Sequence, residues 1–438
     1  MLLPAAWLFF IFVSCAGNSA AHIQANIDTI IQTGSFREIL ALLDSERNSR
    51  NRTSLYANPK NEILFYLDRG MIAHYAGLYQ ESFEDLGTAE WLIEEAFTRS
   101  ITQDIATFII NDNMRDYSGE DYEDLYVNIF NALNRYHLGD LGGALVEIRR
   151  LNEKLVILAD KYERAVRKVK SSDRNLDSID LEASRFSNSA LARYMGILFY
   201  RTIDNPDSVR IEYEELVRAF NLAPEVYSNP IPSSVSEELS IPAGMARLNI
   251  VAFTGLPPIK EERNTLIPLP FPPPNNSARI ALPVMVSRHQ PVNRVEVVLD
   301  SGERFNLELL EDMGAVAKET FKSEYALTVL KSTARAITRT AVGATGAHLA
   351  ERRGGALAGL AVGIATRVFS EAAEHADTRL SRYFPNNALV GGINLEPGAY
   401  MVTVNFYGAG RLIESQRREI SVQRSSLNLE QFVNLRRN

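Results

Sequence analysis

The sequence contains a single cysteine, Cys15, among its 438 residues. One thiol excludes a disulfide within the chain and any zinc site built from several cysteines. Histidine is scarce as well, and none of the six His residues falls in the HExxH pattern or a similar zinc-binding spacing. No Gly-rich phosphate loop ends in Gly-Lys-Ser/Thr, and no Gly-x-Ser-x-Gly elbow occurs. The sequence therefore predicts no metal, no cofactor and no catalytic residue.

The chain also has no excess of basic residues. It contains 46 Lys and Arg and 54 Asp and Glu, which gives a net charge of -8. Nucleic-acid binding depends on clustered cations that neutralise phosphates, so this balance argues against a nucleic-acid partner. The hydrophobic fraction of 46% is that of a folded protein. A single core stops growing at roughly 250–300 residues, so a chain of this length predicts two structural units.

The N-terminus carries an apolar run, residues 8–13, shortly before Cys15. The run is too short to cross a bilayer, which takes about 20 residues, but it has the length of a signal-peptide core. The small neighbours Ser14 and Gly17 make the segment similar to the lipobox of bacterial lipoproteins, in which a diacylglyceryl group is added to the cysteine. We therefore expect residues 1–21 to be a signal and lipid-attachment segment, with Cys15 as the lipid-attachment residue.

Other residues of this segment affect the prediction that Cys15 carries a lipid. By analogy with other lipoproteins, Ala16 rather than Asp after the cysteine favours the outer membrane. The first four residues carry no Lys or Arg, although a signal peptide ordinarily begins with positive charge. Two alternatives stay open. Cleavage after Ala21, with Ser19 as the second small residue, would give a secreted protein without a lipid, and an uncleaved helix would make Cys15 a buried structural residue.

Residues 22–225 form the first expected unit, since apolar residues recur there at the three- and four-residue spacing of helices. An internal repeat indicates a tetratricopeptide-like register. In the clearest copy, Leu64–Trp91, Gly70 falls where two helices cross closely and Gly77 marks the turn between them. Small residues are needed at such crossings because helices approach closely only where side chains are short. The residues expected on the inner face of the second helix are Ser82, Phe83, Leu86 and Ala89.

Two further copies have the same layout. Tyr126–Leu151 places Ala132 at the crossing and Gly139 at the turn. Leu191–Pro224 places Gly196 at the crossing. Three degenerate copies together predict a stack of helix pairs, which creates an extended concave surface suited to a peptide partner.

An acidic stretch from Asp112 to Asp124 lies between the first two copies. It lacks the alternating oxygen ligands and the central Gly of a calcium loop. We interpret it as a helix start that is capped by Ser118, with the carboxylates of the first turn near the positive end of the helix dipole.

Residues 226–438 form the second expected unit, in which prolines punctuate short extended runs. Short strands separated by turn residues predict an antiparallel β-sandwich-like domain, so the expected fold class is α+β with the helical repeats first. The expected strands are Ala246–Phe253, Thr265–Leu269, Ala278–Val286, Arg294–Leu299, Arg304–Leu309, an alternating run over Tyr400–Phe406, and a final pair at Leu412–Ile413 and Glu419–Val422.

A helical insertion at about residues 311–382 interrupts these strands. Gly355, Gly359 and Gly363 lie four residues apart, which lets two helices pack almost backbone to backbone. The apolar run around them, Gly354–Thr366, is shorter than a membrane span. We interpret the insertion as a tight helical hairpin over the β domain. The alternative is that its glycine face forms a membrane contact or an oligomer interface.

Asp300-Ser301-Gly302 is the most enzyme-like string, because it matches the triplet of aspartic proteases. That chemistry needs two carboxylates that share one proton. The chain has one such triplet, so catalysis would require a homodimer. Asp, Ser and Gly are also the residues that favour a hairpin turn, and we interpret the triplet as the turn between the strands at 294–299 and 304–309.

Several segments spread over the chain resemble an uncharacterised family of bacterial envelope lipoproteins. They are Tyr117–Glu123, Ala132-Leu133, Gly139-Asp140, Ala144, Val146–Arg150, Ala192–Tyr194, Tyr213-Glu214, Ile267–Phe271, Ala278–Val284, Ala376–Arg379 and Leu395–Gly398. The resemblance covers nearly all of the chain after the signal. It departs from the family at Tyr383-Phe384-Pro385, where the family usually carries a Trp.

The resemblance implies an envelope lipoprotein with tetratricopeptide-like repeats, a C-terminal β domain and no assigned activity. Relatives look as if they are often encoded near an outer-membrane lipoprotein that activates penicillin-binding proteins, which implies a link to cell-wall synthesis. The leading hypothesis is a non-catalytic scaffold, anchored to the outer membrane and facing the periplasm, whose repeats bind an envelope protein. The alternatives are an envelope hydrolase acting on cell-wall material and a membrane-associated oligomerising protein that uses the Gly-rich hairpin.

Overall fold

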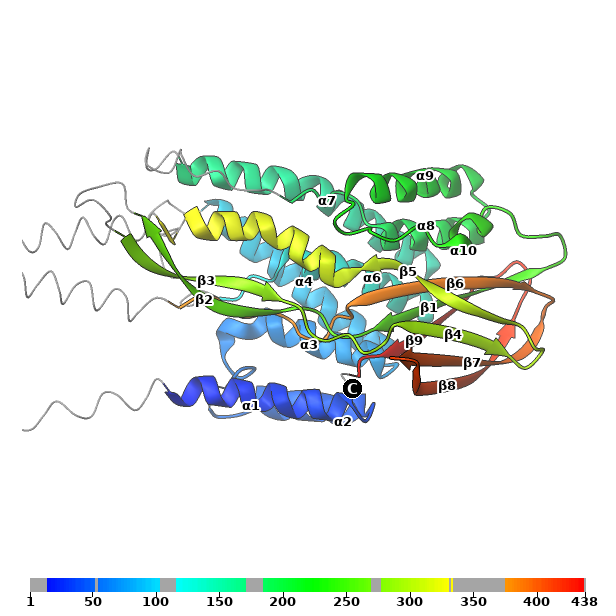
Figure 1. The fold of residues 1–438 in the computed structure, drawn as a ribbon, viewed down its shortest axis with the longest axis horizontal. Coiled ribbons are helices and arrows are strands. Elements are labelled where there is room, and N and C mark those ends of the chain that lie inside the picture. Colours follow the sequence, from blue (N-terminus) through cyan, green and yellow to red (C-terminus); the bar gives the residue numbers. More distant parts are fainter. Residues whose placement is uncertain are drawn as a thin grey trace, which may run out of the picture.

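The computed structural model describes residues 14–51, 54–102, 116–170, 184–268, 277–330, 332–333 and 375–436. Its fold is mixed α+β, as expected, with a helical N-terminal part followed by a part rich in strands (Figure 1). The helices are α1 (Ser14–Ile31), α2 (Phe36–Arg47), the short 3-10 helix η1 (Pro59–Asn61), α3 (Glu62–Tyr75), α4 (Tyr79–Thr102), α6 (Asp121–His137), α7 (Leu141–Lys170), α8 (Ala190–Thr202), α9 (Pro206–Leu222) and α10 (Ser233–Glu237). A further helix covers residues 313–330.

Three consecutive helix pairs make up most of the described helical part: α3 with α4, α6 with α7, and α8 with α9. Neighbouring pairs pack on each other through α4 and α6 and through α7 and α8. Gly77 and Gly139 lie in the turns of the first two pairs with φ of 74° and 81°, which favours glycine. A Cβ at Gly70 would lie 2.7 Å from Leu86 Cγ. The predicted turns and the close crossing of α3 and α4 are therefore confirmed.

The start of α6 differs from the prediction. Its N-cap is Glu120, not Ser118, and the helix begins at Asp121. Glu123 accepts a hydrogen bond at Oε2 from the Glu120 backbone N–H at 2.8 Å, and the two residues form a reciprocal capping box. Tyr117 also donates its hydroxyl to Glu123 Oε2, at 2.7 Å. The carboxylate of Glu120 therefore takes the capping role that we assigned to the Ser118 hydroxyl.

The described strands form one seven-stranded sheet and one separate hairpin. The sheet order is β8-β7-β4-β5-β6-β1-β9, in which β1 and β9 are parallel and the other neighbours are antiparallel. The hairpin pairs β2 with β3. The strands are β1 (Ala246–Thr254), β2 (Ile259–Pro268), β3 (Ser277–Val286), β4 (Arg294–Leu299), β5 (Arg304–Asp312), β6 (Asn387–Leu395), β7 (Gly398–Gly408), β8 (Arg411–Val422) and β9 (Asn428–Asn434).

The strand pattern corrects the sequence interpretation in two places. Residues 412–413 and 419–422 belong to one continuous strand, β8, and are not a pair of strands. The strands β6 and β9 were not predicted at all. A sandwich of two facing sheets is not confirmed, because all seven strands of the main structure belong to one sheet.

The seven-stranded sheet curls until its two edge strands come close together. Gln416 of β8 donates to the carbonyl of Val433 in β9 at 2.7 Å, and Arg418 donates to the carbonyl of Gln431 at 3.0 Å. Side chains rather than a backbone ladder thus join the edges, which protects them from pairing with another chain. The interior is filled by apolar side chains from the strands, including Leu248, Ile250, Val295, Val297, Val402, Val404, Phe406, Ile420 and Phe432.

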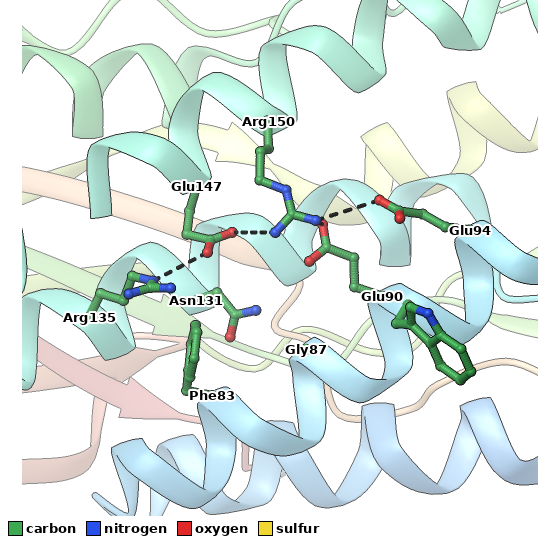
Figure 2. A pocket seen from close by; sticks show the side chains of 9 residues that line it. Phe83, Gly87, Glu90, Glu94, Asn131, Arg135, Glu147 and Arg150 are labelled. Carbon is green, nitrogen blue, oxygen red and sulfur yellow. Dashed lines mark hydrogen bonds and ion pairs between the residues drawn. The ribbon is translucent and has the colours of Figure 1, made fainter. Parts of the chain in front are cut away.

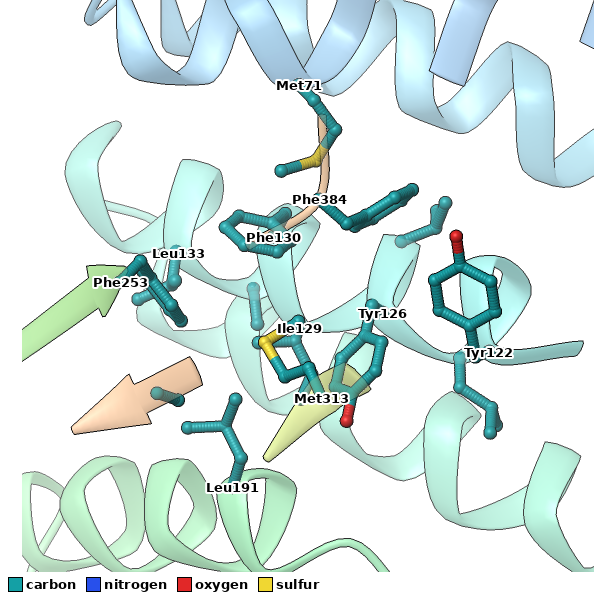
Figure 3. Close-up of a cluster of buried hydrophobic side chains, with 14 of the residues drawn as sticks. Met71, Tyr122, Tyr126, Ile129, Phe130, Leu133, Leu191, Phe253, Met313 and Phe384 are labelled. Atoms are coloured by element: carbon teal, nitrogen blue, oxygen red, sulfur yellow. The ribbon is translucent and has the colours of Figure 1, made fainter. Parts of the chain in front are cut away.

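The outer face of β1 packs against the helices, so both parts of the chain share a hydrophobic core (Figure 3). The rings of Phe130 from α6 and Phe253 from β1 are 5.1 Å apart. His74 of α3 is buried between Asn134 of α6 and Gln431 of β9, within hydrogen-bonding distance of both. The predicted domain boundary at residues 225 and 226 stays a prediction, and the sequence did not reveal this shared core.

The predicted insertion is helical over residues 313–330 and non-helical over 375–382. Its centre, including Gly355, Gly359 and Gly363, lies outside the described residues. Among the described helices, none combines the length and the apolar character that a membrane span requires.

Candidate functional site

A small pocket opens between α4, α6 and α7 (Figure 2). It has a cavity volume of about 180 Å³. Its lining residues are Phe83, Gly87, Glu90, Trp91, Glu94, Asn131, Arg135, Glu147 and Arg150. We call it the Trp91 pocket, because the Trp91 side chain is 61% exposed beside buried polar groups.

The wall on α4 consists of Phe83, Gly87 and Trp91, which follow one another at four-residue spacing along one face of the helix. A Cβ added to Gly87 would meet no atom within 4 Å. Glycine inside a helix costs about 1 kcal/mol relative to alanine, and packing does not demand it here as it does at Gly70. Glycine at this position leaves space between the side chains of Phe83 and Trp91.

Buried carboxylates form the base of the pocket. Glu90 of α4 is 3% exposed and Glu147 of α7 is 2% exposed. Asn128 of α6 bridges them, because its amide nitrogen donates to Glu90 at 2.8 Å and to Glu147 at 2.9 Å. Side chains from three helices are thus held in one hydrogen-bonded network, which fixes the geometry of the pocket.

Cations from α6 and α7 balance these carboxylates. Lys154 Nζ lies 2.7 Å from Glu90 and 2.6 Å from Asp124. Burial alone would lower the pKa of the Lys154 ammonium, but the carboxylates of Asp124 and Glu90 outweigh burial and raise it. Arg150 lies 3.1 Å from Glu90. The buried charges are therefore paired within the protein.

Arg135 contributes both charge and a ring contact. Its guanidinium lies 3.3 Å from Glu147 and 2.5 Å from Asp140. The same group sits over the Phe83 ring at 4.3 Å from the centroid, a cation–π contact. Phe83 was expected on the buried inner face of α4 with Ser82, Leu86 and Ala89. The last three are buried, whereas Phe83 is only partly buried and lines the pocket.

Asn131 supplies a hydrogen-bond donor with no partner among the described residues. The residue is 1% exposed, and its Oδ1 accepts from Asn134 at 3.4 Å. Its amide nitrogen makes no hydrogen bond within the described part of the chain and faces the pocket in Figure 2. An acceptor brought into the pocket could therefore pair with this donor.

The structure does not bring the sequence-predicted site residues together. Cys15 is the second residue of α1, far along the chain from the pocket. Asp300 lies in the turn between β4 and β5, where Gly302 has a φ of 105° and its N–H donates to the carbonyl of Leu299 at 3.1 Å. Asp300 itself accepts from the backbone N–H of Met401 at 3.0 Å. The interpretation of Asp300-Ser301-Gly302 as a hairpin turn is confirmed.

No group of three or more His, Cys, Asp or Glu side chains within the described ranges could hold a metal ion. Sequence reasoning also missed the pocket itself. Two features of the sequence could have indicated the pocket. Trp91 is followed by two glutamates, and Gly87 lies within the same helix, where no turn requires a glycine.

Comparisons with protein-family models, with curated proteins and with solved structures find no match to this chain.

Proposed function

We propose that this chain is a non-catalytic binding protein of the bacterial envelope, anchored by a lipid on Cys15. In this proposal the Trp91 pocket receives part of a partner protein, and the partner belongs to the machinery of cell-wall synthesis. The resemblance to envelope lipoproteins supports the location, on the outer membrane and facing the periplasm. The observation that carries the binding role is an exposed Trp91 next to a preorganised, buried polar network.

The size of the pocket favours a protein partner over a small substrate. Sites for small molecules usually enclose about 300–1,000 Å³, and this pocket has about 180 Å³. That volume suits one side chain of a partner. Binding energy at protein interfaces concentrates in such places, where Trp and Arg are enriched.

The stacked helix pairs support the tetratricopeptide-like repeat as the framework of the binding unit. The pairs α3–α4, α6–α7 and α8–α9 coincide with the three sequence copies, and small residues lie at the predicted crossings. A Cβ at Gly196 would lie 3.0 Å from the Glu212 side chain, just as a Cβ at Gly70 would lie close to the Leu86 side chain. Repeat stacks use their extended surfaces for protein partners.

We expect Gly87→Leu to abolish partner binding without unfolding the protein. The new side chain fills the space between Phe83 and Trp91, and removal of a helical glycine adds up to about 1 kcal/mol of stability. The measurement is affinity capture from detergent-solubilised envelopes of the encoding organism, together with urea unfolding of the same variant. Leu412→Ala, which removes a 55% exposed side chain from β8, is the matched control. Equal capture by wild type and Gly87→Leu would remove the pocket from the proposal.

The anchor has a short connection to the folded body. Ile23 is the first α1 side chain described as buried, and it follows Cys15 by eight residues. Eight helical residues span about 12 Å. The helix α1 begins at one end of the molecule, the end toward which the β2–β3 hairpin extends (Figure 1). A lipid on Cys15 would hold this end close to the bilayer.

We expect Cys15→Ala to move the exported protein from the membrane fraction to the soluble fraction, because no acyl chain is then attached. Cell fractionation with a salt wash measures the change. Ser19→Leu is the control, since it keeps the thiol but removes a small residue needed for cleavage after Ala21. A Cys15→Ala protein that stays on membranes after the salt wash contradicts the anchor.

A further inference from the structure

The helix that forms the wall of the Trp91 pocket is strongly acidic. Between Tyr79 and Glu95 it carries six Asp and Glu and no basic residue. We count the charged residues that line the pocket, together with Glu95 and the residues that form ion pairs with any of them. The set contains six carboxylates and four cations. The carboxylates are Glu90, Glu94, Glu95, Asp124, Asp140 and Glu147, and the cations are Arg99, Arg135, Arg150 and Lys154. The surplus is negative. Charge complementarity therefore favours a cationic occupant.

Two carboxylates that follow Trp91 on α4, that of Glu94 in the pocket lining and that of the adjacent Glu95, are largely exposed to solvent. Glu94 is 55% exposed and lies 3.5 Å from Arg150, and Glu95 is 45% exposed and lies 3.9 Å from Arg99. Both follow Trp91 by about one helical turn, so the two carboxylates and the indole share a face of α4. This arrangement offers a cation both a ring face and negative charge.

Trp91 makes no ring contact, cation contact or hydrogen bond with another residue in the part of the chain that the structure describes. Tryptophan is the side chain that attracts a cation most strongly through its ring face. Two turns earlier on the same helix, Phe83 already carries the Arg135 guanidinium at 4.3 Å. Trp91 lies on the same face of the helix as Phe83, but no cation of the described residues lies over its ring.

An anionic occupant fits the same site poorly. Arg150 lies within 4 Å of three carboxylates, those of Glu90, Glu94 and Glu147. Arg135 lies within 4 Å of two, those of Asp140 and Glu147. A phosphate or carboxylate ligand would have to displace these pairs and would face Glu94.

We propose that the Trp91 pocket binds the arginine or lysine side chain of a basic peptide segment on the partner, with the cation over the indole and beside Glu94 and Glu95. The buried Asn131 amide then donates to a backbone carbonyl of the same peptide. Gly87 provides the room for that backbone. This inference rests on the proposed function and specifies the chemistry of its partner.

Trp91 itself reports on the binding. The sequence has two tryptophans, Trp7 and Trp91. Trp7 lies in the signal segment that is removed when a lipid is attached to Cys15, so the proposed mature lipoprotein in detergent micelles has a single indole, that of Trp91 in the pocket. The probes are acetyl-Ala-Ala-Arg-Ala-Ala-amide and the same peptide with citrulline, the neutral isostere, in place of arginine. We expect the arginine peptide to change Trp91 fluorescence and to bind at least about tenfold more tightly than the citrulline peptide, with an affinity that falls as salt rises.

The double variant Glu94→Gln/Glu95→Gln tests the carboxylates and leaves Trp91 in place. It should reduce the preference for arginine to about threefold or less, whereas Glu214→Gln, which removes a 60% exposed carboxylate from α9, should leave the preference unchanged. Equal binding of the arginine and citrulline peptides overturns the cationic partner but leaves a peptide-binding pocket. No response of Trp91 to either peptide overturns this inference, while capture by the Gly87→Leu variant tests the pocket independently.

Discussion

A Glu238→Ala substitution is expected to lower the free energy of unfolding by about 3–5 kcal/mol, because it removes one partner of a fully buried ion cluster. Glu238 follows α10 and has no exposed side-chain surface. Its Oε1 accepts from Arg247 Nε at 2.7 Å and from Asn249 at 2.6 Å, and Arg201 contacts its other oxygen. Urea denaturation of the full chain measures the loss.

The large cost follows from the charges that would be left behind. The Arg247 side chain is completely buried, and Arg201 is 17% exposed. Burial already lowers the pKa of Arg201 to about 10, so an isolated cation is poorly tolerated there. Without Glu238, the nearest carboxylate to Arg247 is that of Glu237, which is half exposed to water.

Glu237→Ala is the matched control, since the two glutamates are adjacent and both contact Arg247. We expect Glu237→Ala to cost less than about 1 kcal/mol, because exposed ion pairs contribute little. Adding Arg247→Met to Glu238→Ala should restore at least about 1 kcal/mol by removing the unpaired guanidinium. A Glu238→Ala loss no greater than that of Glu237→Ala contradicts the buried-cluster interpretation.

The helical part was predicted well because its signals are local. In the first two copies a small residue at the crossing is followed seven residues later by a glycine at the turn. The structure confirms the crossing at Gly70 and the turn at Gly77. The N-cap of α6 was missed because serine is among the residues that ordinarily cap a helix and glutamate is not. Glu123, the partner of Glu120 in the capping box, is buried and accepts a hydrogen bond from the backbone N–H of Ser381, which is distant in the sequence.

The strand β6 was missed because Gly391 and Gly392 stand in its middle, and glycine ordinarily weakens a strand. The structure gives the reason for them. A Cβ at Gly391 would lie 2.7 Å from Leu307, and a Cβ at Gly392 would lie 2.9 Å from Arg247. These glycines therefore make room for the interior of the curled sheet on one side and for the buried ion cluster on the other. Such requirements arise only once distant strands have paired.

The Trp91 pocket was beyond sequence reasoning for a similar reason. Glu90, Asn128 and Glu147 come from three helices, and nothing local indicates that they meet. Trp91 was assigned to the end of a repeat copy, where an apolar residue is ordinarily buried. Its 61% exposure is a property of the packed helices and not of the motif.

A second large effect is expected in the pH dependence of stability, through Asp68. Its side chain is buried in α3, where Tyr56 donates to Oδ2 at 2.7 Å and Ser381 donates to Oδ1 at 2.6 Å. Burial outweighs these hydrogen bonds and raises the pKa of Asp68 from 3.8 to about 6. Between about pH 4 and pH 6 the folded protein therefore keeps a proton that the unfolded chain releases, and stability falls as pH rises.

We expect Asp68→Asn to remove this dependence. Each pKa unit corresponds to about 1.4 kcal/mol. Because pH 4 already lies above the ordinary pKa of 3.8, wild type should lose about 2.5 kcal/mol more unfolding free energy between pH 4 and pH 8 than the variant does. Asparagine suits the site, because its oxygen can accept from Ser381 and its amide can donate to the Tyr56 oxygen. Urea unfolding at the two pH values provides the measurement.

The comparison between variants isolates Asp68 from groups that act in the opposite direction. Burial lowers the pKa of His74, and it lowers that of His137 from 6.5 to about 4, so these histidines make the folded state less stable as pH falls. Both are present in wild type and variant, and their contributions cancel in the difference. Glu153→Gln removes an exposed carboxylate from α7 and should change the same difference by less than about 0.5 kcal/mol. If Asp68→Asn and Glu153→Gln give the same pH dependence as wild type, Asp68 is ionised in the folded protein throughout this range.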